Sequence, residues 1–150
     1  MIGDLDPMGD SARAEKLQRE GLARELRALG ISPTRQRVDI AHCLLREHQH
    51  LSAEQLQGRL AREARVVPSR ATVYNTLRLL ASRGLLREVV VDPHRVFFDS
   101  NVAPHHHYFD TERCELYDIP STCIRVSGLP PLPPGTVRDE IEVVVRIRRR

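Results

Sequence analysis

The sequence predicts an α+β protein, in which an N-terminal winged helix-turn-helix is followed by a small C-terminal α/β domain. Three segments with helical spacing of apolar residues follow one another, at 32–47, 52–65 and 69–83. Two β-rich runs come directly after them, and strand-like patterns return beyond residue 101. Three helices followed by a hairpin give the element order of a winged helix-turn-helix. We therefore expect one domain over residues 1–99 and a second over residues 100–150.

Each expected helix has a recognisable start or stop. An N-terminal helix over residues 11–29 has leucines near helical spacing, and Gly30 is a natural stop. Ser32-Pro33 offers a cap followed by proline for the second helix. Ser52-Ala-Glu-Gln55 is a capping-box pattern for the third helix, and Pro68-Ser69 precedes the fourth. These signals set the expected boundaries.

The β-rich segments lie in the second half of the chain. Residues 85–91 and 95–99 flank Asp92-Pro93-His94 and predict a hairpin, the wing. Further strands are expected at 105–110, 115–119 and 140–147. A proline-rich connector over 129–135 separates the last two. A C-terminal unit this small can hardly bury a strong core alone, so we expect it to pair with a second copy.

Composition excludes several classes of protein. The chain has 150 residues, 41% of them hydrophobic, and a net charge of +3, which indicates a globular protein. No apolar run could span a bilayer, and residues 1–10 show no secretory signal, so a cytoplasmic location and no membrane partner are expected. Cys43, Cys114 and Cys123 are irregularly spaced, so free thiols are expected, with Cys43 in the core.

The positive charge is concentrated in the middle of the chain. Residues 30–88 carry a net charge of +5, whereas residues 89–150 carry −1. Lys16 is the one lysine among 23 basic residues, and the arginine guanidinium suits phosphates and guanine edges. A nucleic-acid surface is therefore expected in the basic region, although GC-rich coding would produce the same preference for arginine.

The expected helix 69–83 carries the strongest indication of function. Its apolar residues share one side and should face the core: Val73, Leu77 and Leu80. A polar stripe lies on another face: Arg70, Tyr74 and Arg78, with Asn75 beside it. A helix that reads the DNA major groove needs such a stripe, because arginine can contact guanine, asparagine adenine and an aromatic ring a thymine methyl group. A solvated helix face is the alternative, and the wing that follows favours DNA.

Four motifs follow one another along the chain: Thr34-Arg-Gln-Arg37, His50-Leu-Ser-Ala-Glu54, Ala71-Thr-Val-Tyr-Asn-Thr-Leu77 and the triple histidine 105–107. Together they resemble the ferric uptake regulator family over nearly all of residues 22–149. Within the family, the chain most resembles the iron response regulator (Irr) branch. Three segments carry this similarity: the triple histidine with the residues that follow it, Glu115–Pro120, and Val143–Arg148. The resemblance implies a homodimeric winged-helix regulator of iron and haem genes that binds a palindromic DNA operator, with a C-terminal dimerisation domain that senses metal or haem.

The resemblance also implies which residues contact DNA. In a helix placed in the major groove, Tyr74 is the residue expected to touch bases. The full set expected at DNA is Arg35, Arg37, Arg70, Thr72, Tyr74, Asn75 and Arg78. Many family members have a basic residue just before the first motif, for insertion into the minor groove. Ser32 stands there in this chain, which leaves that contact open.

The triple histidine is the candidate sensing site. Neighbouring residues on a strand point to opposite faces, so His105 and His107 can share one ion while His106 points away. By motif position in the family, the remaining ligands are His50, Asp99 and Asp118. Histidine and carboxylate ligands suit Fe, Mn or Zn, and a ligand set drawn from both domains would tie metal occupancy to domain orientation.

Haem is the second possible effector at the same place, with an axial ligand from His105, His106 or His107. Tyr108 and Phe109 stand where many relatives continue with Asp-His, so one family metal site is expected to be lost, and the two rings could flank a haem instead. No Cys-Pro haem motif and no paired Cys-x-x-Cys motif occurs, so no structural zinc site with four cysteine ligands is expected. A purely structural histidine cluster is the third possibility.

The sequence therefore favours a dimeric transcription regulator of iron or haem homeostasis, and not an enzyme. A metal-dependent hydrolase would need a general acid or base over an open metal position, and no HExxH-like spacing is present. A metal- or haem-binding protein with a non-functional DNA-binding half is the remaining alternative. The operator sequence and the direction of the effect are left open.

Overall fold

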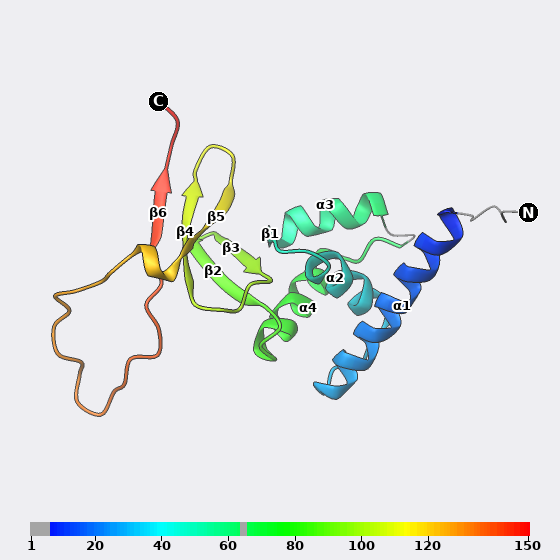
Figure 1. Cartoon of the computed structure of the whole chain (residues 1–150), viewed down its shortest axis with the longest axis horizontal. Coiled ribbons are helices and arrows are strands. Elements are labelled where there is room, and N and C mark those ends of the chain that lie inside the picture. Colours follow the sequence, from blue (N-terminus) through cyan, green and yellow to red (C-terminus); the bar gives the residue numbers. More distant parts are fainter. Residues whose placement is uncertain (1–6, 64–65) are drawn as a thin grey trace, which may run out of the picture.

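A computed structural model describes residues 7–63 and 66–150 of the chain and shows helices at one end and two small sheets at the other (Figure 1). In chain order the elements are α1 (Pro7–Ala28), α2 (Arg35–Leu45), β1 (His50–Ser52), α3 (Ala53–Glu63), α4 (Arg70–Ser82), β2 (Arg87–Asp92), β3 (Arg95–Asp99), β4 (His105–Asp110), β5 (Glu115–Pro120), a 3-10 turn (Ser121–Cys123) and β6 (Val144–Ile147). The strand orders are β1-β3-β2 and β5-β4-β6. The expected α+β class, with a winged helix-turn-helix first, is confirmed.

The helix starts depend on local side-chain hydrogen bonds. The Ser52-Gln55 capping box is confirmed, because the Gln55 N–H donates to Ser52 Oγ at 3.2 Å and the Ser52 N–H donates to Gln55 Oε1 at 2.9 Å. The expected Ser32-Pro33 start of α2 is wrong. Thr34 is the N-cap, since its backbone is extended and its hydroxyl accepts the Arg37 N–H at 3.3 Å.

Ser52→Ala should lower the free energy of unfolding by about 1 kcal/mol, because the Gln55 N–H at the start of α3 loses its acceptor. Urea unfolding followed by circular dichroism measures the change. Ser82→Ala is the control: its hydroxyl donates to the Leu79 carbonyl on an exposed turn, and its loss should change stability by less than about 0.5 kcal/mol. Equal effects of the two substitutions would contradict the role given to the capping box.

The wing lies between two hydrophobic cores. Side chains alternate along β3, so Phe98 packs into the helical core while Phe97 packs against the sheet of β4, β5 and β6. The Phe97 ring lies 5.9 Å from the Phe109 ring, centroid to centroid. The same face of β2 adds Val89 and Val91 to this second core. The two sheets are therefore in direct apolar contact.

Two features of the sheets differ from the expectations. The three-residue strand β1 was not expected; it pairs antiparallel with β3. The last strand begins at Val144, four residues later than expected, and pairs in parallel with β4. The residues before it are held by individual contacts, such as the hydrogen bond from the His107 N–H to the Val143 carbonyl at 3.0 Å.

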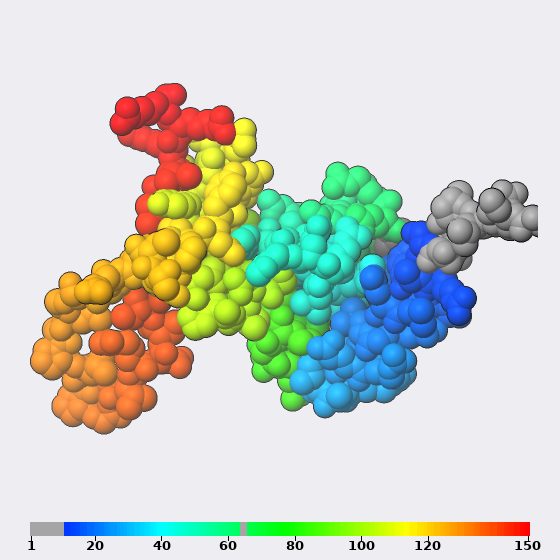
Figure 2. Space-filling model, in the orientation of Figure 1, coloured from blue at the N-terminus to red at the C-terminus, as the bar shows by residue number. Residues whose placement is uncertain are grey.

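Residues 125–139, which we call the arm, are exposed and contain no helix or strand. Figures 1 and 2 show the arm as an open loop that projects from the end of the molecule opposite the helices. A turn at its tip is closed by the Thr136 N–H, which donates to the Pro133 carbonyl at 3.2 Å. Within the described residues, no helix has the length and apolar character that crossing a membrane requires.

Candidate metal centre and nucleic-acid interface

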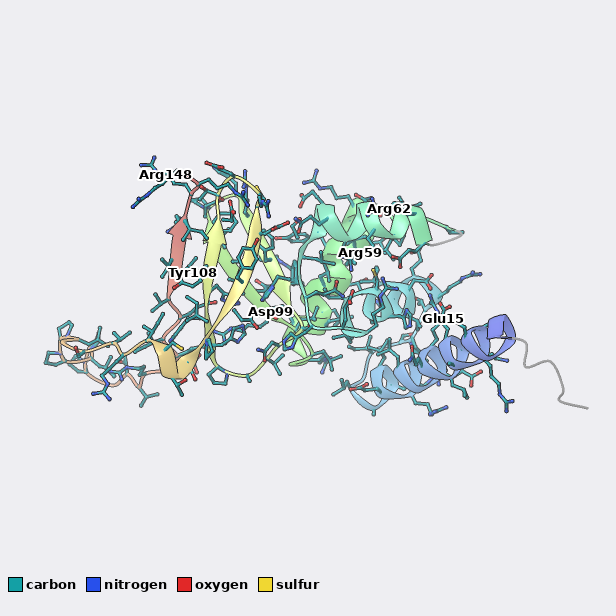
Figure 3. The ribbon with its side chains drawn as sticks, turned by 45° about the horizontal axis from the view of Figure 1, so that its top comes forward. Glu15, Arg59, Arg62, Asp99, Tyr108 and Arg148 are labelled. Carbon is teal, nitrogen blue, oxygen red and sulfur yellow. The ribbon has the colours of Figure 1, made fainter. Side chains whose placement is uncertain are left out.

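The candidate metal centre lies where the wing meets the second sheet. His50 faces Asp99 across the β1–β3 ladder, and His107 faces Asp118 across the β4–β5 ladder. Residues directly opposite in a ladder project to the same face, and His105 shares the face of His107 because it lies two residues earlier. Figure 3 labels Asp99 at this junction. The Phe97–Phe109 contact brings the two faces together, so the pairs meet.

One potential ligand atom from each of these five residues lies within 4.8 Å of the others. Asp99 Oδ2 lies 2.8 Å from His105 Nε2, 3.1 Å from His107 Nε2 and 3.2 Å from His50 Nε2. Asp118 Oδ1 lies 2.6 Å from His50 Nε2. The structure thus brings together His50, Asp99, His105, His107 and Asp118, the five residues expected from the sequence as metal ligands.

Hydrogen bonds at Nδ1 set the orientation of the His105 and His107 rings. His105 Nδ1 lies 2.7 Å from the Ala103 carbonyl, and His107 Nδ1 lies 3.1 Å from Glu142 Oε1. Both Nδ1 atoms are therefore placed to donate, which leaves Nε2 as the ring atom that faces the carboxylates and can coordinate an ion. His50 Nε2 is buried and, among the described residues, makes no hydrogen bond of acceptable geometry. Such nitrogens suit a cation between them and the carboxylates.

The electrostatics of the group are strongly perturbed. Burial disfavours the charged form of Asp99, but hydrogen bonds from His107 and the Asn101 N–H, together with the nearby His50 ring, outweigh it and hold the Asp99 pKa well below its usual range. Burial likewise disfavours imidazolium at His107, yet its hydrogen bonds with Asp99 and Glu142 raise its pKa to about 9. Without a metal ion, a proton on His107 therefore balances part of the carboxylate charge.

The donor set fits a divalent transition metal. Three imidazole nitrogens and two carboxylate oxygens are ligands that Fe, Mn and Zn accept. Two carboxylate charges match one divalent ion, whereas three neutral imidazoles add none. When bound, the ion would hold the wing residues and the second sheet to one centre.

Metal affinity should rise with pH up to about 9, because a metal ion must displace the proton that His107 holds below its raised pKa. One displaced proton gives about a tenfold increase in affinity per pH unit. Competition titrations with a chromophoric chelator at several pH values below 9, corrected for protonation of the chelator, measure the slope. An affinity independent of pH would contradict the linkage.

The residues expected to flank a haem do not lie together. His106 is on the opposite face from its neighbours, and its Nδ1 accepts the Val143 N–H at 3.2 Å. Phe109 is buried against Phe97, whereas Tyr108 is 42% exposed on the other side of the sheet. The expectation that the Tyr108 and Phe109 rings flank one haem is wrong, because adjacent strand residues point to opposite faces.

Helix α4 presents the residues expected at DNA along two sides. Arg70 pairs with Glu54 of α3, Asn75 is exposed, and Arg78 lies over the Tyr74 ring with its guanidinium carbon 4.9 Å from the ring centroid. Tyr74 is half-buried, with its ring edge-on to Phe98 at 6.1 Å. The expected stripe is therefore partly engaged in contacts within the protein.

A hollow lies between α4 and the start of α2. Its volume is about 270 Å³, and its lining comprises Thr34, Arg37, Thr72, Asn75 and Thr76. The Arg37 guanidinium donates to the Ser32 carbonyl at 3.0 Å, and Arg37 and Asn75 line the same hollow. Arg35 is exposed in the first turn of α2. Arg37, Thr72 and Asn75 thus come together from segments that are far apart in the sequence.

Sequence reasoning missed several residues of both regions. Glu142 contacts His107, and a polar position in the alternating segment 140–147 was the available signal. His94 and Arg95 at the tip of the wing line a 420 Å³ pocket with Tyr74 and Cys114. A histidine and an arginine at the turn of the hairpin were a signal for a surface near α4, although nothing in the sequence placed Cys114 there.

The fold and the site define a winged-helix protein in which a histidine–carboxylate group joins the wing to a second sheet. The profile of the Ferric uptake regulator family matches residues 28–124. The chain therefore belongs to the ferric uptake regulator family, whose members are transcription regulators and not enzymes.

Known proteins show the extent of this similarity. The chain is 35% identical over 89 residues to the ferric uptake regulation protein of Synechocystis sp., a match that covers 57% of this chain and 53% of the relative. The chain thus spans about half the length of the curated relatives it matches.

Solved structures support the fold. The Pseudomonas aeruginosa ferric uptake regulator with manganese has a TM-score of 0.61 at 23% identity, covering 84% of this chain and 96% of that one. The Vibrio cholerae ferric uptake regulator has a TM-score of 0.65 at 18% identity, covering 85% and 98%.

Proposed function

We propose that this protein is a dimeric, metal-responsive transcription regulator that binds operator DNA in the cytoplasm. The observation that carries the proposal is the convergence of ligand atoms from the wing strand β3, from β1 and from the second sheet on one centre. An ion at this centre favours the arrangement in which the five residues meet. It can therefore change DNA affinity only if DNA also prefers that arrangement.

We infer that residues 1–99 form the DNA-binding part and residues 100–150 the dimerisation and sensing part. In the DNA-binding part, α4 would enter the major groove of each half-site. The contacts to bases and phosphates would come from Arg35, Arg37, Arg70, Thr72, Tyr74, Asn75 and Arg78. Their support is the cap that starts α4 at Ser69 and the shared hollow of Arg37, Thr72 and Asn75.

The homodimer is supported by two apolar surfaces that the chain leaves exposed. On the outer face of the second sheet, Tyr108 is paired with Tyr117 and with Val145, and all three are at least 36% exposed. The arm exposes Leu129, Leu132 and other apolar side chains at the same end of the molecule. A second copy that covers both would remove this surface from water.

We propose Fe, Mn or Zn as the effector. The two carboxylates in the group favour a metal cation, and the separation of Tyr108 from Phe109 gives haem less support. An iron or haem role, and membership of the Irr branch, rest on the motif resemblance around the triple histidine.

The test begins with selection of an operator from a randomised duplex library by the metal-loaded protein. Operator affinity of the metal-free protein is then titrated with Fe(II), Mn(II), Zn(II) and haem under anaerobic conditions. The proposal expects a palindromic operator and a change in affinity with at least one metal ion. Binding that none of these ligands alters would contradict metal regulation. Tight metal or haem binding without any selected operator would instead indicate a binding protein with a non-functional DNA-binding half.

A further inference from the structure

Glu142 lies outside the five-residue group but contacts it directly. It stands between the arm and β6, and its Oε1 lies 3.1 Å from Nδ1 of the fully buried His107. Glu142 is itself 24% exposed, so its carboxylate is partly shielded from water. The opposite nitrogen of the same ring, Nε2, lies 3.1 Å from Asp99 Oδ2. The His107 ring is therefore held between a carboxylate at the centre and one outside it.

The same short segment also contacts the wing. Arg87, the first residue of β2, faces Asp99 across the β2–β3 ladder. Its Nη2 lies 2.6 Å from Glu140 Oε1 and 3.8 Å from Glu142 Oε2. Arg87 is 12% exposed, so these ion pairs are poorly solvated. Glu142 thus lies between the wing and the histidine that the second sheet supplies.

We propose that Glu142 is a positioning residue for the metal centre: it sets the tautomer and orientation of His107 and joins that ring to the wing through Arg87. The inference rests on the proposed metal-binding function. A carboxylate that accepts the Nδ1 proton leaves the Nε2 lone pair for the ion and makes the imidazole a stronger ligand. The contact with Arg87 helps to keep the Glu142 carboxylate in place.

The test compares three variants of the full-length protein. Glu142→Ala removes the acceptor, Glu142→Gln keeps an oxygen acceptor but removes the charge, and Glu140→Ala removes the other partner of Arg87 without touching His107. Zn(II) affinity is measured by competition with a chelator, and Co(II) absorption reports the ligand field. Glu142→Ala should lower Zn(II) affinity by about 10- to 100-fold. The Zn(II) affinity of Glu142→Gln should lie between those of Glu142→Ala and the parent, and Glu140→Ala should bind Zn(II) as tightly as the parent does.

A second measurement does not depend on metal affinity. Nitrogen-15 NMR of the imidazole rings identifies the protonated nitrogen, and in the Zn(II)-loaded parent His107 should carry its proton on Nδ1 in slow exchange with water. Glu142→Ala should make that proton exchange faster, whereas Glu140→Ala should leave it protected. Circular dichroism checks that each variant is folded, and Glu142→Gln tests the contact if the alanine variant is not.

The outcomes separate this inference from the proposed function. Parental Zn(II) affinity and a protected Nδ1 proton in Glu142→Ala would overturn the positioning role. Equal losses in Glu142→Ala and Glu140→Ala would overturn it as well, because they would indicate the general charge of the segment. A parent that binds no Zn(II), Co(II), Mn(II) or Fe(II) would refute the proposed function, and the ring-proton measurement on the metal-free protein would still decide whether Glu142 orients His107.

Discussion

Asp99→Asn should weaken the binding of a divalent metal ion by roughly 100-fold or more, the upper end of the losses known for groups that support a metal site. Asp99 Oδ2 lies within 3.2 Å of the Nε2 atoms of all three histidines, so it is the central atom of the group. Asparagine keeps the size of the side chain but removes one of two negative charges that balance the ion. Calorimetric titration of the metal-free protein with Mn(II) or Zn(II) measures the loss.

Two comparisons make this result specific. Asp118→Asn should cost less, because Asp118 is 37% exposed and more easily replaced by water. Asp92→Asn makes the same chemical change at the end of β2, outside the five-residue group, and should leave metal affinity unchanged. An Asp99→Asn protein that binds metal like the parent would exclude this centre as the metal site.

Tyr74→Ala should weaken binding to the selected operator by about 1–3 kcal/mol, the range of a good base contact. The ring lies between the Phe98 edge and the Arg78 guanidinium, so its removal also frees Arg78 from its present position. A gel-shift titration with the metal-loaded protein measures the loss. Unfolding in urea, recorded in parallel, separates weaker DNA binding from lower stability.

The matched control is Tyr74→Phe, which keeps the ring packing on Phe98 and the platform for Arg78 but removes the hydroxyl. We expect it to bind the operator within a few-fold of the parent, since the ring faces carry the apolar contact. Parental affinity in the alanine variant would refute the placement of α4 in the groove. A large loss in the phenylalanine variant would show that the hydroxyl, and not the ring, contacts DNA.

The sequence was sufficient for the order of the helices and the wing, because caps, apolar spacing and turn residues are local signals. The capping box at Ser52 is such a case. The strand β1 escaped prediction because three residues are too few to show alternation, and only its pairing with β3 defines it. The start of α2 was misplaced because Ser32 and Thr34 are both good caps, and the backbone decides between them.

For the candidate site, local patterns placed His105 and His107 on one face of a strand. His50, Asp99 and Asp118 came from the motif resemblance, since no spacing rule links residues on separate strands. Two ladder registers and the packing of Phe97 on Phe109 bring them together, and both are tertiary properties. Glu142 was missed for the same reason, because it follows an irregular segment whose return path cannot be derived from spacing.

The adjacent phenylalanines of β3 make the wing intolerant of any slip along its own axis. If β3 shifted by a single residue, Phe97 and Phe98 would exchange sides, and Asp99 would turn away from the histidines at the same time. A mispaired hairpin therefore loses the packing of Phe97 and Phe98 in both cores and, at the same time, the Asp99 carboxylate at the metal centre. Because the ion binds only when Asp99 faces the histidines, metal binding would stabilise the correct strand register over a register shifted by one residue.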